Sequence, residues 1–508
     1  MPKVVATMDF NIIVIGSGFA GSLAAAALSK IGFRVALIDR GHHPRFAIGE
    51  SSTPTANLVL RDIAKRYGLE KLEPLTRYGT WRNTYPDTTC GLKRGFSYFH
   101  HDLDHPFQPF DDHRNELVVA ASRSDAVSDT HWLRADVDQL FATIAAESGA
   151  VGMFDREIRQ VARVGSAWKL VVADRDGQIE TATAEFLVDA SGRGGVLQKQ
   201  LGLPDRTQHL AARSRAIYTH VAPAPSWTGQ LEKLGGRVAD HPFHADHAAQ
   251  HHLFANGWWW LLPFDDGTCS VGLARQMNAL PSTGAESTPV EEIRHWLERL
   301  PTLHTLLEPT SLRDVPGRWI DSGRLQHRVG LIAGPGYALL PHAAGFVDPL
   351  HSTGIAHSLC GLERLLLVLE QTWGKPELAD QLARYAAQVD AELDLIDRIV
   401  DCGYGSLDHF ELFVATTMLY FAGATGFERR RDPRNPSQTL FLCAQLSDWQ
   451  DLVRRAHEAI RGPGGVGRGN QDPKRLAEAL CDWLQPFNHV GLCDKSLQNM
   501  YGQTAAEM

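Results

Sequence analysis

Residues 11–40 read NIIVIGSGFAGSLAAAALSKIGFRVALIDR, and this stretch decides the fold. The apolar run before the glycines predicts a strand, the Ala-rich run after them predicts a helix, and VALI predicts a second strand. In the GxGxxG spacing, Gly16 permits a tight turn, Gly18 lets a pyrophosphate approach the backbone, and Gly21 lets helix and strand pack closely. Asp39 ends the second strand, where it can accept a hydrogen bond from an adenosine ribose. We therefore predict a Rossmann-type β-α-β unit that binds a dinucleotide.

The composition is that of a globular protein and argues against several partners. The chain has 508 residues and a formal net charge of -9, which disfavours nucleic acid or an anionic membrane as the main partner. Its seven cysteines are scattered without a CxxC pair, which predicts reduced thiols and a cytoplasmic location. The opening MPKVVATMDFNIIVIG does not resemble a signal peptide, and no apolar run approaches the roughly 18 residues of a membrane span.

Three later segments resemble the para-hydroxybenzoate hydroxylase superfamily of FAD proteins. They are LRADVDQLF at 133–141, VDASGR at 188–193 and AAGFVDP at 343–349. The superfamily usually has Gly-Asp just ahead of the last segment, where the aspartate meets the ribityl chain of the flavin, but here His342 stands in that place. The resemblance implies that the dinucleotide is FAD, held in part by Arg134, Asp189, Phe346, Asp348 and Pro349.

The segment WWWLLP at 258–263 narrows the class. It resembles the WxWxIP motif of flavin-dependent halogenases, with Leu262 in place of isoleucine. On a strand, Trp258 and Trp260 point to the same face, where two indoles could separate the flavin from an organic substrate. The alternative interpretation is an aromatic strand of the protein core.

The segment FVDPLHSTG at 346–354 matches the halogenase pattern FxxPxxSxG at every fixed position. Ser352, Thr353 and Gly354 precede a predicted helix, and successive amides at a helix start can bind an anion without a charged side chain. In the family, the amides of the Thr-Gly pair are associated with chloride, so the resemblance implies a halide site at Thr353 and Gly354. The alternative is a helix cap and turn, which is compatible with the halide site.

The segment GESSTP at 49–54 matches the GES segment of the halogenases, which implies that Glu50 and Ser51 lie at the cofactor. The family has a lysine after this segment, and Lys93 in CGLKRGFSYF is the best candidate if an insertion near 74–90 is assumed. Such a lysine holds hypohalous acid by a hydrogen bond or as a haloamine. Partial burial and the neighbouring Arg94 cation would lower its pKa and favour the neutral amine. The alternative is a solvated lysine.

His351 replaces the glutamate of the PLESTG segment of tryptophan halogenases, because this chain reads PLHSTG. A histidine can act as a base near neutral pH. The change counts against free tryptophan as the substrate and favours a phenol or another electron-rich ring.

The resemblance implies an FAD-dependent halogenase that uses reduced FAD, oxygen, and chloride or bromide on an electron-rich aromatic of phenol, pyrrole or indole type. One GxGxxG unit lies between a strand and a helix, so we expect a separate flavin reductase to supply the reduced cofactor. The substrate is either free or tethered to a carrier protein. One alternative is a flavin monooxygenase that hydroxylates an aromatic substrate, and another is a flavin-binding carrier or sensor without turnover.

These patterns predict an α/β protein of three parts. A Rossmann-type FAD-binding domain takes residues 8–204 and 320–365, with an insertion at 85–125, and VGLIA at 329–333 is a predicted buried strand. A second, mixed sheet-rich substrate region takes residues 205–319. A helical C-terminal region takes residues 366–508. From the amphipathic runs we predict helices at 131–150, 355–373, 379–400, 409–422, 447–461 and 474–485.

Histidines are dense in HPFHADHAAQHH at 241–252. His247 and His251 are four residues apart, a spacing that can bind a metal if the segment is helical. No glutamate follows His247 to complete HExxH, so we predict a polar loop or a substrate-facing surface and no metal site.

Overall fold

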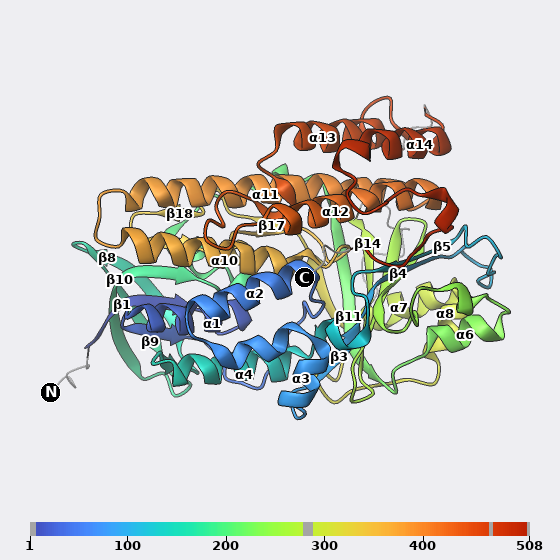
Figure 1. Cartoon of the computed structure of the whole chain (residues 1–508). Coiled ribbons are helices and arrows are strands. Elements are labelled where there is room, and N and C mark those ends of the chain that lie inside the picture. The colour runs from blue at the N-terminus through green and yellow to red at the C-terminus, as the bar shows by residue number, and fades with distance from the viewer. Residues whose placement is uncertain (1–6, 278–287, 467–470, 505–508) are drawn as a thin grey trace.

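The computed structural model describes residues 7–277, 288–466 and 471–504, and its architecture is mixed α/β (Figure 1). The first sheet has eight strands, with the order β18-β19-β10-β1-β2-β7 and the hairpin strands β8 and β9 attached to β10. The pairs of β1 with β2 and β10, of β2 with β7, and of β10 with β19 are parallel. The strands are β1 (Thr7–Ile15), β2 (Val35–Ile38), β7 (Val151–Met153), β8 (Glu157–Val164), β9 (Ala167–Ala173), β10 (Ile179–Asp189), β18 (Ala333–Gly334) and β19 (Tyr337–Leu339).

Helix α1 (Phe19–Ile31) follows the glycine turn and packs against α4 (Arg134–Glu147) and α10 (Thr353–Thr372). This is the predicted Rossmann arrangement of a parallel sheet covered by helices. The expected strand at 329–333 is wrong. Leu331 is 50% exposed there, and the parallel strand next to β10 is β19, which lies just beyond the segment. An apolar run of five residues was too short a signal to separate a strand from an ordered loop.

The second sheet has nine strands, with the order β15-β11-β14-β13-β12-β4-β5-β21 and β16 paired with β11. The residues expected as an insertion at 85–125 supply β4 and β5, so this segment contributes two central strands to the second sheet. The boundary expected at residue 320 is also displaced, because β16 lies in the second sheet. The strands are β4 (Gly95–His100), β5 (Glu116–Ala120), β11 (Ser214–Ala222), β12 (Ala248–Phe254), β13 (Gly257–Pro263), β14 (Cys269–Gln276), β15 (Ser311–Leu312), β16 (Ile320–Arg324) and β21 (Met500–Tyr501).

The C-terminal part is helical, as predicted, except that β21 returns to pair with β5. The expected domain boundary at 365/366 falls inside α10, so that helix is shared rather than divided. In Figure 1 the long helices α10 and α11 run across the Rossmann part and α12 continues toward the second sheet. The helices are α11 (Leu378–Ser406), α12 (Phe410–Arg430), α13 (Ser447–Arg461) and α14 (Pro473–Leu484).

Helix α12 is long and apolar enough to cross a membrane by length and composition alone, a feature that the sequence analysis overlooked. However, 83% of its apolar window is buried inside the protein, as in the core helix of a globular fold.

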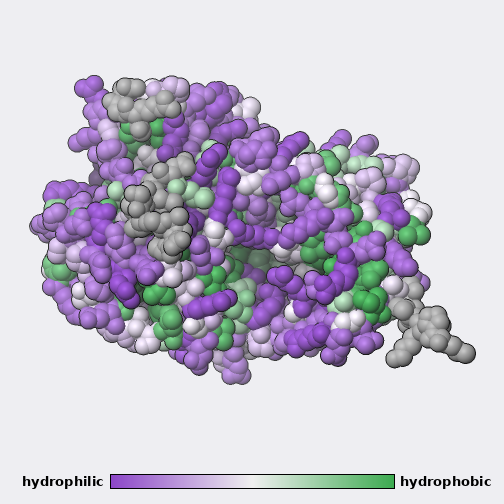
Figure 2. All heavy atoms as spheres, turned by 180° about the vertical axis from the view of Figure 1, so that it is seen from behind, coloured by the Kyte–Doolittle hydropathy of each residue, from purple (hydrophilic) through white to green (hydrophobic). Residues whose placement is uncertain are grey.

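The face of the molecule drawn in Figure 2 is mostly hydrophilic, with scattered hydrophobic patches and a hollow near its middle.

Candidate active site

The glycine turn between β1 and α1 has the geometry that its spacing predicts. Gly16 has φ of +101°, which side chains rarely allow, and a Cβ on Gly21 would lie 1.9 Å from the carbonyl oxygen of Gly16. A Cβ on Gly18 would meet nothing nearer than Arg134 Nη2 at 3.5 Å, and Gly18 is half-exposed. Gly16 and Gly21 are therefore required by the local backbone, while Gly18 leaves open space beside the start of α1.

Asp39 lies at the end of β2 with its carboxylate turned toward this glycine turn. It accepts hydrogen bonds from the Ser17 amide (2.7 Å), the Ser17 hydroxyl (2.8 Å), the Gly41 amide (2.9 Å) and the Arg45 guanidinium (3.2 Å). Burial would raise its pKa, but these hydrogen bonds and the Arg45 charge lower it overall. Asp39 is therefore an ionised acceptor at the position where a ribose is expected.

Arg134 and Asp138 join α4 to the turn. The guanidinium makes two hydrogen bonds of 2.9 Å to the Asp138 carboxylate and reaches the Ile48 and Gly49 carbonyls at 3.0 and 3.1 Å. Asp138 also accepts the first amide of α1, from Phe19, at 3.0 Å. The pair thus holds the segment before Glu50 against the start of α1.

Two other predicted cofactor residues are buried and hydrogen-bonded within the protein. Asp189 accepts amide hydrogens from Ser191 and Leu197, each at 2.8 Å, and orders the loop after β10. Asp348 accepts hydrogen bonds from the Ser214 and Tyr404 hydroxyls and the Leu350 amide, and burial raises its pKa to about 6. Both side chains are at most 1% exposed, so these carboxylates position loops around the site.

The tryptophans of β13 alternate as predicted. Trp258 and Trp260 share one face with their rings 5.8 Å apart, while Trp259 packs into a separate core cluster on the other face. Trp258 donates a hydrogen bond of 3.0 Å to the Tyr404 hydroxyl, which in turn donates to Asp348 at 3.0 Å. The WWWLLP and FVDPLHSTG segments are therefore joined through α11.

The GES segment connects the predicted lysine to the predicted halide segment. Lys93 Nζ donates to the Ser52 carbonyl at 2.5 Å, and the Ser51 hydroxyl accepts a hydrogen bond of 3.1 Å from the Ser352 hydroxyl. Glu50 is 2% exposed and lies 2.8 Å from His220 Nε2. Three sequence motifs that lie far apart in the chain, GESSTP, the segment of Lys93 and FVDPLHSTG, thus meet around residues 50–52.

Lys93 is completely buried, so the alternative of a solvated lysine is wrong. It ends β3 (Cys90–Lys93), pairs across the strands with Asp129 of β6 (Asp129–Trp132), and lies 4.0 Å above the Phe96 ring. Burial lowers the pKa of Lys93 to about 8, against an opposing effect of Asp129, whose own pKa burial raises to about 7. Arg94 is not the cause, because its guanidinium pairs with Asp125 at 2.8 Å.

Aromatic rings connect Lys93 to His351. Phe96 lies 5.8 Å from Tyr420, and Tyr420 stacks on His351 at 5.0 Å with an angle of 7° between the rings. Neither nitrogen of His351 has a hydrogen-bond partner among the described residues. Burial lowers the pKa of His351 to about 3, which counts against the expectation of a base that titrates near neutral pH. The ring is neutral, with one free donor and one free acceptor.

Thr353 and Gly354 form the first positions of α10, after Ser352 in the left-handed conformation with φ of 52°. Gly354 is half-exposed, and both residues line a small pocket with Phe346 and the exposed His342. Their amides belong to the first turn, where helix N–H groups have no partner inside the helix. Pro349 is half-buried, and its carbonyl accepts the Ser352 amide at 2.9 Å.

Sequence reasoning missed the residues around Lys93 and His351 that belong to other elements. Asp129 lies opposite Lys93, and His251 of β12 lies between Tyr98 (ring centroids at 4.4 Å) and Trp258 (5.1 Å). No motif marks Asp129 or Tyr420. His251 stood out in the sequence only as part of the histidine-rich run, and its place on a strand rules out the helical pair with His247.

The residues fit a bound FAD and halide. An open glycine turn, an ionised acceptor at the end of β2 and an arginine beside the turn suit an adenosine diphosphate group. The pocket at Thr353 and Gly354 offers helix amides next to Ser352, which is hydrogen-bonded to Ser51, and Lys93 donates to the neighbouring Ser52 carbonyl.

Comparisons with known proteins identify the family of the chain. The model of the tryptophan halogenase family matches residues 130–408, more than half of the chain, and a model of an NAD(P)-binding Rossmann-like domain matches residues 14–67. The chain is 28% identical to the monodechloroaminopyrrolnitrin halogenase PrnC of Pseudomonas fluorescens, with 95% of this chain and 87% of that protein aligned. It is 29% identical to the tetracycline 7-halogenase of Kitasatospora aureofaciens, covering 80% of this chain and 71% of that protein.

The fold is also similar to solved structures. The structure of the halogenase PltM in complex with phloroglucinol and FAD has a TM-score of 0.85 to this chain at 23% identity, covering 97% of this chain and 99% of that chain. The flavin-dependent brominase Bmp2 has a TM-score of 0.61 at 16% identity, covering 94% of this chain and all of that chain.

Proposed function

The chain belongs to the tryptophan halogenase family and is an FAD-dependent halogenase, and from this we propose that its substrate is a small electron-rich ring of phenol or pyrrole type. The observation that carries the proposal is the buried Lys93, which adjoins an aromatic cluster that also holds the neutral, unpartnered His351. The relatives support it, since one halogenates monodechloroaminopyrrolnitrin, one a tetracycline, and one a pyrrole-2-carbonyl group on a carrier protein.

When bound, reduced FAD supplies the reaction with oxygen that oxidises chloride or bromide to hypohalous acid. Thr353 and Gly354 present first-turn amides of α10 toward the small pocket and hold the halide there. Trp258 and Trp260 separate the flavin from the organic substrate. Gly18, Asp39 and Arg134 hold the adenosine diphosphate part of the cofactor, and Glu50 and Ser51 lie between the flavin and the lysine.

Lys93 carries the halogen to the substrate. Its neutral amine attacks hypohalous acid, a nitrogen–halogen bond forms, and the displaced oxygen leaves as water with one amine proton. The ring carbon then takes the halogen, and the nitrogen receives the ring proton, which regenerates the amine. A pKa of about 8 makes the neutral form accessible near physiological pH, which an exposed lysine would not allow.

His351 orients the substrate as a neutral hydrogen-bonding group. A phenol hydroxyl or a pyrrole N–H can donate to its bare nitrogen, while its N–H can donate to a substrate oxygen. A low pKa favours this role over that of a strong base. A carboxylate at this position suits an indole N–H, and the histidine therefore favours rings other than that of free tryptophan.

A separate flavin reductase is the expected protein partner, because the sequence has one GxGxxG unit between a strand and a helix. We place the enzyme in the cytoplasm. All seven cysteines lie in the described part of the chain and carry free thiols, which fits a reducing compartment.

The substrate proposal is tested by mass spectrometry of a panel of phenols, pyrroles and indoles with reduced FAD, oxygen and either chloride or bromide. We expect halogenated phenols or pyrroles whose formation requires halide, and little or no product from free tryptophan. Hydroxylated products that form without halide would overturn the proposal and favour the monooxygenase. Efficient halogenation of free tryptophan would contradict the role given to His351.

A further inference from the structure

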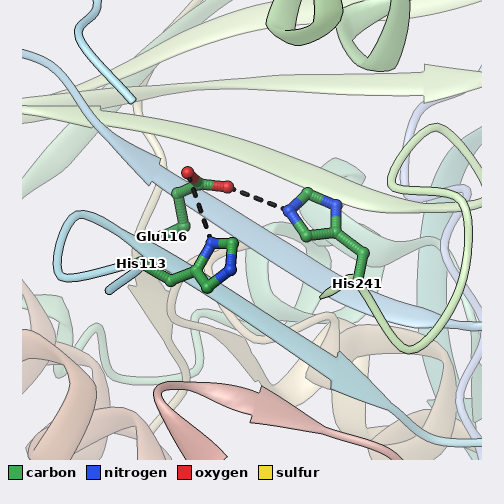
Figure 3. Close-up of side chains that lie close together, drawn as sticks. All are labelled: His113, Glu116 and His241. Carbon is green, nitrogen blue, oxygen red and sulfur yellow. Dashed lines mark hydrogen bonds and ion pairs between the residues drawn. The ribbon is translucent and has the colours of Figure 1, made fainter. Parts of the chain in front are cut away.

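A second cluster of histidine and carboxylate side chains lies at the start of β5, away from the flavin and lysine residues. Figure 3 shows His113, Glu116 and His241 turned toward one another. His113 Nδ1 lies 3.6 Å from one oxygen of the Glu116 carboxylate, and His241 Nε2 lies 3.0 Å from the other. One ligand atom from each residue lies within 4.8 Å of the other two.

The three side chains are at most 2% exposed. The Nδ1 atom of His113 has no hydrogen-bond partner among the described residues, although it faces the carboxylate, and neither has Nδ1 of His241. Buried polar atoms are usually hydrogen-bonded, and an exception calls for an explanation. A lone pair of His113 directed at a carboxylate oxygen would be repelled by it, unless a proton or a cation lies between them.

The surroundings of His113 favour a cation. Its second nitrogen, Nε2, lies 3.3 Å from the Asp240 carboxylate, which itself pairs with Arg237 at 3.0 Å. Histidines that bind a metal through one nitrogen usually donate the other N–H to a carboxylate or carbonyl, which fixes the tautomer and makes the ligand more basic. His113 has this arrangement, with Glu116 on one side and Asp240 on the other.

We propose that His113, Glu116 and His241 bind one Zn²⁺ ion, with water as the fourth ligand. Two imidazoles and one carboxylate suit zinc. At ligand distances of about 2.0–2.1 Å, tetrahedral donors lie about 3.3 Å apart, and the two observed contacts lie on either side of this value. Small rotations of the Glu116 carboxyl group would therefore admit the ion without a change of backbone.

The zinc has a structural role. It ties the loop that carries His241 to the start of β5, and the carbonyl of His113 accepts a hydrogen bond of 3.2 Å from Asn499, just before β21. The same loop reaches the halogenation site, because the Arg94 amide donates to the His247 carbonyl at 2.6 Å. The ion thus stabilises the edge of the second sheet and, through this loop, the backbone next to Lys93.

The test uses the full-length protein, purified without metal-affinity chromatography and treated with a chelator. We measure Zn²⁺ binding by calorimetry, melting temperature with and without Zn²⁺, and the visible absorption of the Co²⁺ form. We expect one tight Zn²⁺ per chain, a higher melting temperature with Zn²⁺ but not with Mg²⁺, and a four-coordinate Co²⁺ spectrum. Equal melting temperatures with and without Zn²⁺, or no tight binding, would overturn the proposal.

Variants separate this site from weak binding by surface histidines. His241→Ala and Glu116→Gln should each lose the tight Zn²⁺ and the Co²⁺ spectrum, whereas His209→Ala, at an exposed histidine, should keep both. Glu116→Gln nearly preserves the shape of the side chain, so it remains informative if His241→Ala does not fold. Tight Zn²⁺ binding that survives in both site variants would exclude these ligands.

Discussion

At the scale of the residue, Lys93 and Asp129 form a buried pair in which burial lowers the pKa of the amine to about 8 and raises the pKa of the carboxyl to about 7. Replacing Lys93 by methionine keeps most of the volume and removes the amine. We expect Lys93→Met to lower the rate of product formation by about two orders of magnitude or more, while FAD binding and hydrogen peroxide release continue. Product is measured by mass spectrometry. As a control, Lys233→Met changes an exposed lysine of α6 (Trp227–Lys233) and should form product at the parental rate. A parental rate in Lys93→Met would show that Lys93 takes no part in the reaction.

The protonation of Lys93 gives the reaction a pH dependence with a definite sign. The amine is mostly protonated below its pKa of about 8 and mostly neutral above it. Because the neutral form accepts the halogen, halogenation per hydrogen peroxide formed should rise with pH through this value, between about one unit below and one unit above. The ratio of product to peroxide is measured across the range. A ratio that falls over the same range would mean that the ammonium acts instead, as a hydrogen-bond donor.

His351 offers hydrogen bonds but little basicity, so its replacement should mainly weaken the binding of the substrate. His351→Phe keeps a flat ring against Tyr420 and loses both nitrogens, and we expect KM for the substrate to rise by roughly 2- to 13-fold. His351→Gln keeps a donor and an acceptor and should have a smaller effect. Steady-state kinetics measure both. The role of a base would be shown instead by two results together. The activity of the parent enzyme would fall as the pH drops through about 6.5, and the activity of His351→Gln would not.

At the scale of the element, the start of α10 allows the halide site to be tested through the backbone. A Cβ on Gly354 would lie 3.7 Å from the Phe346 ring, an ordinary contact. Gly354→Ala keeps the amide, whereas Gly354→Pro removes it at a first-turn position where no intrahelical hydrogen bond is lost. We expect Gly354→Pro to raise KM for halide by about 10- to 100-fold, and Gly354→Ala to leave it nearly unchanged. Circular dichroism checks the fold, and equal halide KM values in the two variants would argue against an anion site here.

The elements that could be predicted were those defined by local periodicity. The β-α-β unit and the long helices of the C-terminal part match their expected positions to within a few residues, except that α11 and α12 each extend several residues beyond the expected end. The strand predicted at residues 329–333 was wrong because a run of five apolar residues has no periodicity that distinguishes a strand from a loop. The contact between Lys93 and Asp129 could not be predicted either, since it depends on the register of β3 against β6 and no local signal specifies that register.

At the scale of the whole molecule, the second sheet explains why the domain boundaries were displaced. Its nine strands come from residues 95–120, 214–324 and 500–501, so three distant parts of the chain build one layer. The same non-local assembly brings Glu116 next to His241, which is 125 residues away. Motifs that match a known family could be located in advance because their spacing is local. The residues that the non-local assembly places next to these motifs could not be located in advance, because no local pattern marks them.

Within the residues that the structure describes, one GxGxxG turn lies between a strand and a helix, and its Gly18 lies beside Arg134. Because this turn is needed for FAD, the described part of the chain offers a nicotinamide cofactor no second Rossmann turn from which to reduce the flavin. We therefore expect the purified chain with FAD and NADPH or NADH to show no nicotinamide oxidation above background and no product. FAD reduced by light or by an unrelated flavin reductase should restore halogenation. Gly18→Val, which places a side chain in the pyrophosphate path, should make no product with either electron source. Rapid NADPH oxidation by the chain alone, coupled to halogenated product, would mean that reduction occurs within the same protein.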